Sequence, residues 1–215
     1  VLPLAAFLGA FLTTLLIVSV ANRIGNSRSA VILAGIAFTA VLNAGISFIS
    51  LLDTDVLTSY NYFSIGGLSG VRMASLPVPA AIIFISLAAA LVFSKRIDLL
   101  SLGDAAASAL GLRVKLLRML CLVCASAAAA AVVSFAGLLG FVGLVVPHMA
   151  RRLFGWGMAR QLVSSAFLGG TLVILADLLG RVLFAPSELP VGIMMSAIGT
   201  PFFFILLLRG RGNSA

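Results

Sequence analysis

The sequence predicts an all-α polytopic integral membrane protein, and three observations predict it. Of the 215 residues, 62% are hydrophobic and only 9% are charged, whereas soluble domains carry about 25% charged residues. The mean hydropathy is +1.24. Several apolar stretches also reach the ~20 residues that an α-helix needs to cross a bilayer. We find no tandem repeat or low-complexity linker, so residues 1–215 are expected to form a single transmembrane domain.

About seven transmembrane helices are expected along the chain. Their ranges are 1–22, 30–52, 77–94, 119–134, 137–155, 162–183 and 191–208. The fifth reads GLLGFVGLVVPHMARRLFG, and its glycines at 137, 140 and 143 indicate a close-packed break between two helices. Pro147 is expected to bend this helix. Arg151 and Arg152 are expected to end it at the water interface.

Two connections between these spans are expected to be structured. Residues 53–76 are too polar to cross the bilayer and too long for a tight turn, so we predict an external loop that holds a short interfacial helix. Residues 95–118 form the other connection. There Asp104 can cap a short helix, and Gly111 can end that helix in a left-handed conformation. A second short basic helix, LRVKLLR, is expected to lead into the fourth span.

The basic residues predict the orientation of the chain. If the first span ends in the cytoplasm, 12 of the 14 Lys and Arg residues fall on that side, and only Arg72 and Arg181 fall on or near the other. The twelve are Arg23, Arg28, Lys95, Arg96, Arg113, Lys115, Arg118, Arg151, Arg152, Arg160, Arg209 and Arg211. Since cytoplasmic loops of membrane proteins carry an excess of Lys and Arg, segment 95–118 and the C-terminus are expected inside.

Other features of the composition have a plainer interpretation than a functional one. The net charge of +8 would suggest nucleic acid in a soluble protein, but here it follows the positive-inside pattern. Cys121 and Cys124 form a CxxC pair inside an apolar run, which favours packing over redox or metal chemistry. Because the chain opens with Val1 inside an apolar segment, we expect it to lack N-terminal helices of a longer protein.

Few residues could carry chemistry. His148 is the only imidazole, so a His-based metal site has no second histidine, and a hydrogen bond in a turn is the simpler interpretation. No motif of a protease, hydrolase or phosphate-binding loop is present. Asp177 and Arg181 are spaced i, i+4 within the sixth span. They are either a pair that holds the helix end at the interface or a docking charge for a partner.

Two long stretches carry a resemblance to a known family. GLLGFVGLVVPHMARRLFG and LADLLGRVLFAPSELPVGIMMSAIGTPFFFILL resemble the permease subunit of the ABC importers for iron-siderophores, haem and vitamin B12, which are type II importers of the FecCD type. The segment SLGDAAASALGLRVKLLR is similar to that family's cytoplasmic coupling segment. The family has about ten transmembrane helices, so the resemblance implies that this chain is roughly the last seven.

The resemblance implies partners and a role for particular residues. The partners are a second permease subunit, two ATP-binding subunits that hold ATP and Mg²⁺, and an extracytoplasmic substrate-binding protein, all at a bacterial inner membrane. The chain itself would be no enzyme and would bind no cofactor or metal. Four groups of residues follow: coupling to the ATPase (Gly103, Asp104, Leu110, Gly111 and Arg113), docking (Arg181 and Arg72), the translocation pathway (Asn43, Ser47, Met194, Ser196 and Thr200) and a structural signature (Pro147, His148, Arg151, Glu188 and Pro190).

The coupling segment reads GDAAASALG where many relatives carry several glutamates, so its partner would be contacted through shape and backbone, with Arg113 and Lys115 at its flank. The alternative class is an ion-coupled secondary transporter. Acidic residues near the bilayer midplane would favour that class, but almost none are present in this sequence.

The resemblance also bears on the substrate. An iron-siderophore is the first choice, and haem, cobalamin and oxyanions are left open.

Overall fold

The computed structural model describes residues 2–24, 28–186 and 188–210. Within them the chain forms ten α-helices and one 3₁₀ turn. These are α1 (Leu2–Ile24), α2 (Arg28–Leu52), α3 (Thr54–Ile65), η1 (Met73–Ser75), α4 (Pro77–Val92), α5 (Ser94–Leu100), α6 (Asp104–Ala109), α7 (Val114–Ala136), α8 (Val142–Phe154), α9 (Met158–Leu183) and α10 (Val191–Gly210). Arg211, which contributes to the predicted orientation, lies outside the described residues.

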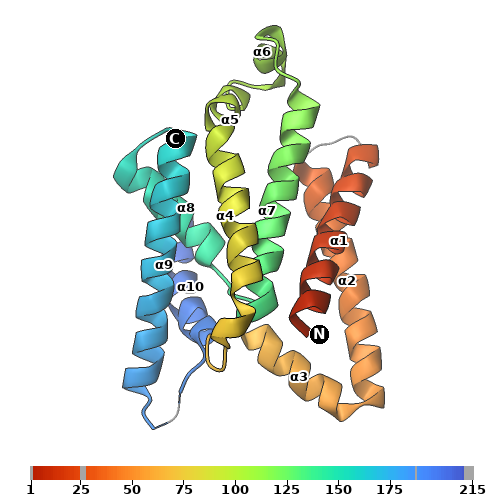
Figure 1. Ribbon diagram of the computed structural model, residues 1–215, viewed down its shortest axis with the longest axis vertical. Coiled ribbons are helices and arrows are strands. Elements are labelled where there is room, and N and C mark those ends of the chain that lie inside the picture. Colours follow the sequence, from red (N-terminus) through yellow and green to blue (C-terminus); the bar gives the residue numbers. More distant parts are fainter. Residues whose placement is uncertain (1, 25–27, 187, 211–215) are drawn as a thin grey trace.

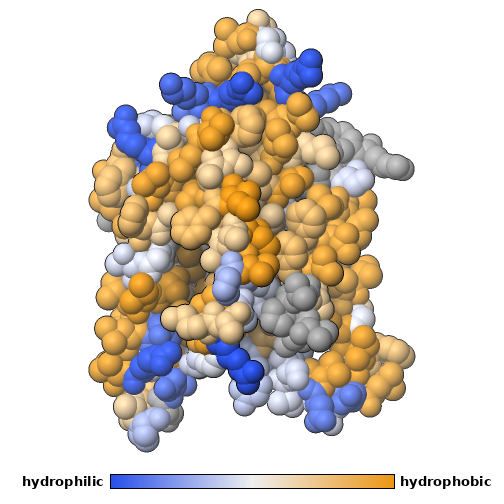
Figure 2. Space-filling view, in the orientation of Figure 1, coloured by the Kyte–Doolittle hydropathy of each residue, from blue (hydrophilic) through white to orange (hydrophobic). Residues whose placement is uncertain are grey.

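The long helices run side by side between two polar ends. Helices α4 and α7 lie in the middle, with α1 and α2 on one flank and α8, α9 and α10 on the other (Figure 1). The short helices α5 and α6 lie at the upper end of this view, and α3 lies at the lower end. Figure 2 shows a broad hydrophobic band between hydrophilic residues at both ends. This pattern is typical of a bundle that spans a membrane.

The expected number of seven spans is not confirmed. In the described part of the chain, α2, α7 and α9 are long and apolar enough to cross a bilayer, and α4 with α5 is a fourth candidate that bends by 62° at its break. Helices α1 and α10 contain shorter apolar stretches, Ala5–Ile17 and Val191–Phe204. Helix α8 has 13 residues and is therefore ~20 Å long, which is less than the ~30 Å thickness of a bilayer core.

The break that the glycine spacing predicts between the fourth and fifth spans is present. Residues 137–141 are not helical, and α8 begins at Val142, so Gly143 lies inside the helix rather than in the break. At this break, residues 136–142 contact two other segments, the end of α3 with the residues after it (63–67) and the start of α10 with the residues before it (189–199). We call the contact of these three segments the junction.

Backbone hydrogen bonds connect the three segments of the junction. The N–H of Gly67 donates to the carbonyl of Ala136 over 2.8 Å, and the N–H of Leu138 donates to the carbonyl of Phe63 over 3.1 Å. The N–H of Gly192 donates to the carbonyl of Gly66 over 3.3 Å. Backbone groups inside a bilayer must find partners within the protein, so these bonds allow the helix to stop without exposing polar groups to lipid.

Glycines are required where the segments of the junction touch. A Cβ on Gly192 would collide with the backbone carbonyl of Ile65, and a Cβ on Gly199 would collide with the side chain of Phe141. Phe141 is itself left-handed, with φ 62°, a conformation that bulky residues rarely adopt. Beside these contacts lies a buried cluster of Ala176, Val191 and Met195 that joins α9 to α10.

Gly192→Ala should destabilise the protein, because the colliding atom is a backbone carbonyl that cannot swing away. We expect a loss of about 1–3 kcal/mol in the free energy of unfolding, as in other overpacked sites. Thermal unfolding of the purified protein in detergent measures it. Gly170→Ala in α9 is the control, because a Cβ there meets nothing within 4 Å. Equal stability of the two variants would contradict the close approach at Gly192.

Candidate functional site

The predicted coupling segment is a bent, helical projection at the upper end of the bundle. Helix α5 continues α4 after the 62° bend, and α6 follows after a turn at Gly103, whose φ is 99°. An ion pair fastens α6 to α7: Arg118 Nη2 donates to both carboxylate oxygens of Asp104, over 2.8 and 3.0 Å. The only buried residue of α6 is Ala107, so the other side chains of this helix remain accessible to a partner.

Gly111 ends α6 in a left-handed conformation, as the sequence predicts. Its φ is 81°, its N–H donates to the carbonyl of Ser108, and the N–H of Leu112 donates to the carbonyl of Ala107. This pair of bonds is a Schellman motif, in which a positive φ after the helix allows the last carbonyls to be satisfied. Leu110 precedes the glycine as the C-cap residue, with its side chain exposed.

Two expectations for this segment are wrong. Asp104 does not cap α6: the N-cap position is Gly103, no side chain caps the helix, and Asp104 is the first helical residue. Its carboxylate accepts hydrogen bonds from Arg118 instead, because this guanidinium lies within hydrogen-bond distance, about one turn into α7. There is also no separate basic helix, since Val114 already begins α7 and Arg113 is its N-cap residue. Val114 and Leu117 in these first turns are buried, so the beginning of α7 packs on the bundle as part of the same helix.

Sequence reasoning missed Asp98, which joins the coupling segment to another helix. Its Oδ1 accepts a hydrogen bond of 2.8 Å from the backbone N–H of Met158, the first residue of α9. The sequence did contain a signal for a role of Asp98. Asp98 and Asp104 are the only acidic residues among the many basic ones expected at this end of the bundle.

The charged residues of the sixth predicted span form a cluster near the opposite end of the bundle. Arg181 Nε lies 2.8 Å from Asp177 Oδ2, as the i, i+4 spacing predicts, and Arg181 Nη1 lies 3.8 Å from Glu188 Oε2. The same Glu188 oxygen accepts a bond of 3.1 Å from Ser69 Oγ. We call these four residues the charged cluster. It carries two negative groups and one positive group, and the Arg181 side chain remains 42% exposed.

Arg72 lies in the loop that also contains Ser69 of the charged cluster. It is the exposed N-cap residue of η1, and its carbonyl accepts a bond from Ser75 Oγ. The hydrogen bond from Ser69 to Glu188 therefore joins the loop of Arg72 to the segment that follows α9. The loop of Arg72 is thus connected through Glu188 to Arg181, which lies in the last turn of α9.

The proposed pathway residues form two groups that this chain does not bring together. Asn43 and Ser47 are exposed on α2, which packs on α1 and α3. Thr200 is exposed on α10, on the other flank of the bundle (Figure 1). Met194 packs toward Gly180 beside the buried cluster, and Ser196 Oγ donates to the carbonyl of Gly192. Their role in a pathway stays a prediction.

The signature residues of α8 have structural contacts. The expectation of a turn at His148 is wrong, because this residue lies inside α8; its ring lies edge-on to Phe202 of α10, with centroids 6.2 Å apart. Arg151 stacks its guanidinium over the ring of Trp156 at 4.9 Å, a cation–π contact at the end of the helix. Pro147 lies inside α8. Among the described residues, no group of three or more His, Cys, Asp and Glu side chains could hold a metal ion.

The signature residues Glu188 and Pro190 lie between α9 and α10. Glu188 belongs to the charged cluster. The carbonyl of Pro190 accepts a hydrogen bond from the N–H of Ile193 in the first turn of α10. These residues therefore connect the charged cluster to the junction.

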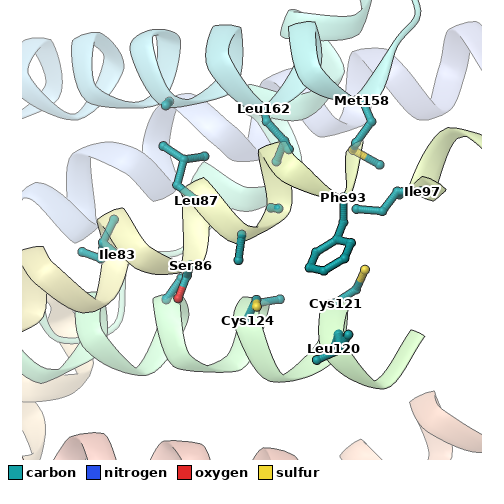
Figure 3. A pocket seen from close by; sticks show the side chains of 15 residues that line it. Ile83, Ser86, Leu87, Phe93, Ile97, Leu120, Cys121, Cys124, Met158 and Leu162 are labelled. Atoms are coloured by element: carbon teal, nitrogen blue, oxygen red, sulfur yellow. The ribbon is translucent and has the colours of Figure 1, made fainter. Parts of the chain in front are cut away.

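An apolar cavity of about 380 Å³ lies between α4, α7 and α9. Figure 3 shows Cys121 and Cys124 pointing toward it from α7, opposite Phe93 of the α4–α5 bend and Met158 of α9. Both cysteines are free and partly buried. Their apolar surroundings agree with a packing role.

Comparison with known proteins decides the family. The sequence model of the FecCD transport family matches residues 1–209 of this chain. The chain belongs to this family. It is 37% identical over 215 residues to a Helicobacter pylori protein assigned as an iron chelatin transport system permease. It is 34% identical over 213 residues to the Fe(3+) dicitrate transport system permease protein FecD of Escherichia coli, and 33% identical over 208 residues to the hemin transport system permease protein HmuU of Yersinia pestis.

These alignments cover nearly all of this chain and part of each relative. They include 98%, 98% and 96% of this chain, and 65%, 66% and 62% of the respective relatives. A solved ABC transporter assigned to the metal-chelate type, in an inward-facing conformation, superposes with a TM-score of 0.80 at 26% identity. That comparison covers 96% of this chain and 71% of the solved one. This FecCD-family chain therefore shares the helical arrangement of a permease.

Proposed function

We propose that this FecCD-family chain is part of the membrane-spanning permease subunit of an ATP-driven importer. The observation that carries the proposal is the match of the family over residues 1–209, together with relatives named as permeases for iron chelates and hemin. ATP hydrolysis is assigned to a partner subunit that binds ATP and Mg²⁺. The alternative, an ion-coupled secondary transporter, lacks support, because the acidic residues of the described chain lie near the ends of the helices rather than in the middle of the bundle.

The bundle is proposed to lie across a bacterial inner membrane with α5 and α6 in the cytoplasm. The basic residues of loops at the upper end in Figure 1 support this orientation through the positive-inside rule. The charged cluster then faces outside, and α10 ends inside. The proposed partners follow this division: ATP-binding subunits at α6, a substrate-binding protein at the charged cluster, and a second permease subunit beside the exposed face of α2.

Alternating access is the proposed mechanism. ATP binding would draw two ATP-binding subunits together and move α6, which the Asp104–Arg118 ion pair fastens to α7. Because α7 leads directly into the junction, its tilt would reach α8 and α10, close one gate and open the other. The named relatives favour an iron chelate or hemin as the substrate.

Docking is proposed at Arg181, with Arg72 as a second contact. Arg181 is already paired with Asp177 and lies 3.8 Å from Glu188. The distance from Arg181 to Glu188 is the longer of the two, so this ion pair is the weaker one. An acidic side chain of a binding protein would therefore compete with Glu188 for Arg181, rather than with Asp177. Exposed ion pairs contribute only about 0–1 kcal/mol, so this exchange is energetically accessible.

Arg181→Glu should reduce the ATPase stimulation by the binding protein about tenfold, because charge reversal places like charges across the interface. Arg72→Glu should reduce it less. The measurement uses the complete transporter in liposomes, with the basal ATPase rate as a check of assembly. Asp55→Lys, an exposed acid of α3, is the charge-reversal control and should remain within about twofold of the unsubstituted complex. Unchanged stimulation in Arg181→Glu would refute docking there.

Gly111→Ala should uncouple transport from ATP hydrolysis. A Cβ there meets nothing within 4 Å, so the effect comes from the left-handed backbone, which costs about 1–2 kcal/mol for Ala and will displace α6. The ratio of substrate transported to ATP hydrolysed in proteoliposomes should fall. Gly111→Asn is the matched control, because Asn tolerates this conformation. If Gly111→Ala keeps the unsubstituted ratio, the coupling role of α6 is wrong.

A further inference from the structure

The hydrogen bond from Met158 to Asp98 connects the coupling segment to the beginning of α9. The N-cap residue of α9 is Gly157, which has no side chain to cap the helix. The carboxylate of Asp98, from α5, fills that role over 2.8 Å. A helix N-terminus carries a partial positive charge and unpaired N–H groups, so a carboxylate is a favoured partner at this place.

Apolar contact accompanies this hydrogen bond. Ile97 of α5 and Met158 of α9 both line the apolar cavity, and Figure 3 shows their side chains next to each other beside Phe93. Helix α5 also contacts α9 directly, so the Asp98 bond is not the sole contact between these two helices. On its other side the segment is fastened to α7 by the Asp104–Arg118 pair. The coupling segment thus has one polar attachment to each of two long helices.

Helix α9 extends from this attachment to the charged cluster. It runs without interruption from Met158 to Leu183, which corresponds to ~39 Å. Arg181 and Asp177 lie in its last two turns. Displacement of its first turn would therefore be transmitted toward Arg181, because α9 is one continuous helix without proline, with Gly169 and Gly170 near its middle as the site where it would bend most easily.

We propose that Asp98 is a positioning residue that makes the coupling segment and α9 move together, so that the occupancy of the charged cluster and the position of α6 are linked. The inference rests on the proposed function, since it assigns the route by which docking outside reaches the ATPase inside. Asp98 itself touches neither the binding protein nor the substrate. Its effect passes through the first turn of α9.

The test compares three variants of the complete transporter in liposomes. Asp98→Ala removes the hydrogen-bond acceptor and should reduce stimulation of the ATPase by the binding protein about fivefold, in line with the loss of a helix cap, while the basal rate stays unchanged. Asp98→Asn keeps an acceptor oxygen and should retain most of the stimulation. Ser101→Ala is the control within the same segment, because it removes only a local bond to the carbonyl of Asp98.

Spin labels at Ser108 of α6 and Ala159 of α9 give a second measurement that needs no Asp98 variant. Their distance should stay constant between the nucleotide-free and ATP-bound transporter, since the two elements move together. Full stimulation in Asp98→Ala, or a label distance that changes with ATP, would overturn the inference while leaving the permease assignment intact. Absence of stimulation in the unsubstituted complex would instead overturn both the proposed function and this link.

Discussion

The break between α7 and α8 imposes the strictest physical constraint on the bundle. A helix that stops within an apolar layer leaves N–H and carbonyl groups without partners, and lipid supplies none. The junction resolves this through hydrogen bonds that cross between three segments far apart in the sequence. Such bonds need close backbone approach, which explains the glycines at 66, 137 and 192. The arrangement of α3, α8 and α10 around one point depends on these contacts.

Two long helices connect the ends of the molecule in different ways. Helix α7 runs from the Asp104–Arg118 pair to the junction. Helix α9 runs from the Asp98 bond to the charged cluster, and its side joins α10 through the buried Ala176. A force applied to α6 would therefore reach the junction along one helix and the charged cluster along the other. The fold thus offers two mechanical routes between α6, the proposed site of the ATP-binding subunits, and the charged cluster, the proposed site of the binding protein.

Local chemistry allowed much of the fold to be predicted. Apolar length and proline placement located the long helices, the glycine spacing located the break before α8, and Gly111 has the expected left-handed conformation. The i, i+4 pair of Asp177 and Arg181 was also predictable. Contacts between distant segments were not. Asp98 to Met158 and Ser69 to Glu188 join residues 60 and 119 positions apart, and no periodicity of one helix can indicate such partners. The length of α8 was overestimated for the same reason, since its first residues belong to the junction.

The central claim is that the coupling segment and the charged cluster face opposite sides of the membrane. The most direct measurement is labelling of single cysteines with a membrane-impermeant thiol reagent, after both native cysteines are replaced by alanine. Ser108→Cys reports on α6, and Ser59→Cys reports on the exposed face of α3 at the other end. We predict that Ser59→Cys is labelled in intact cells and Ser108→Cys only in inverted vesicles. Labelling of both positions from the same side would contradict the account.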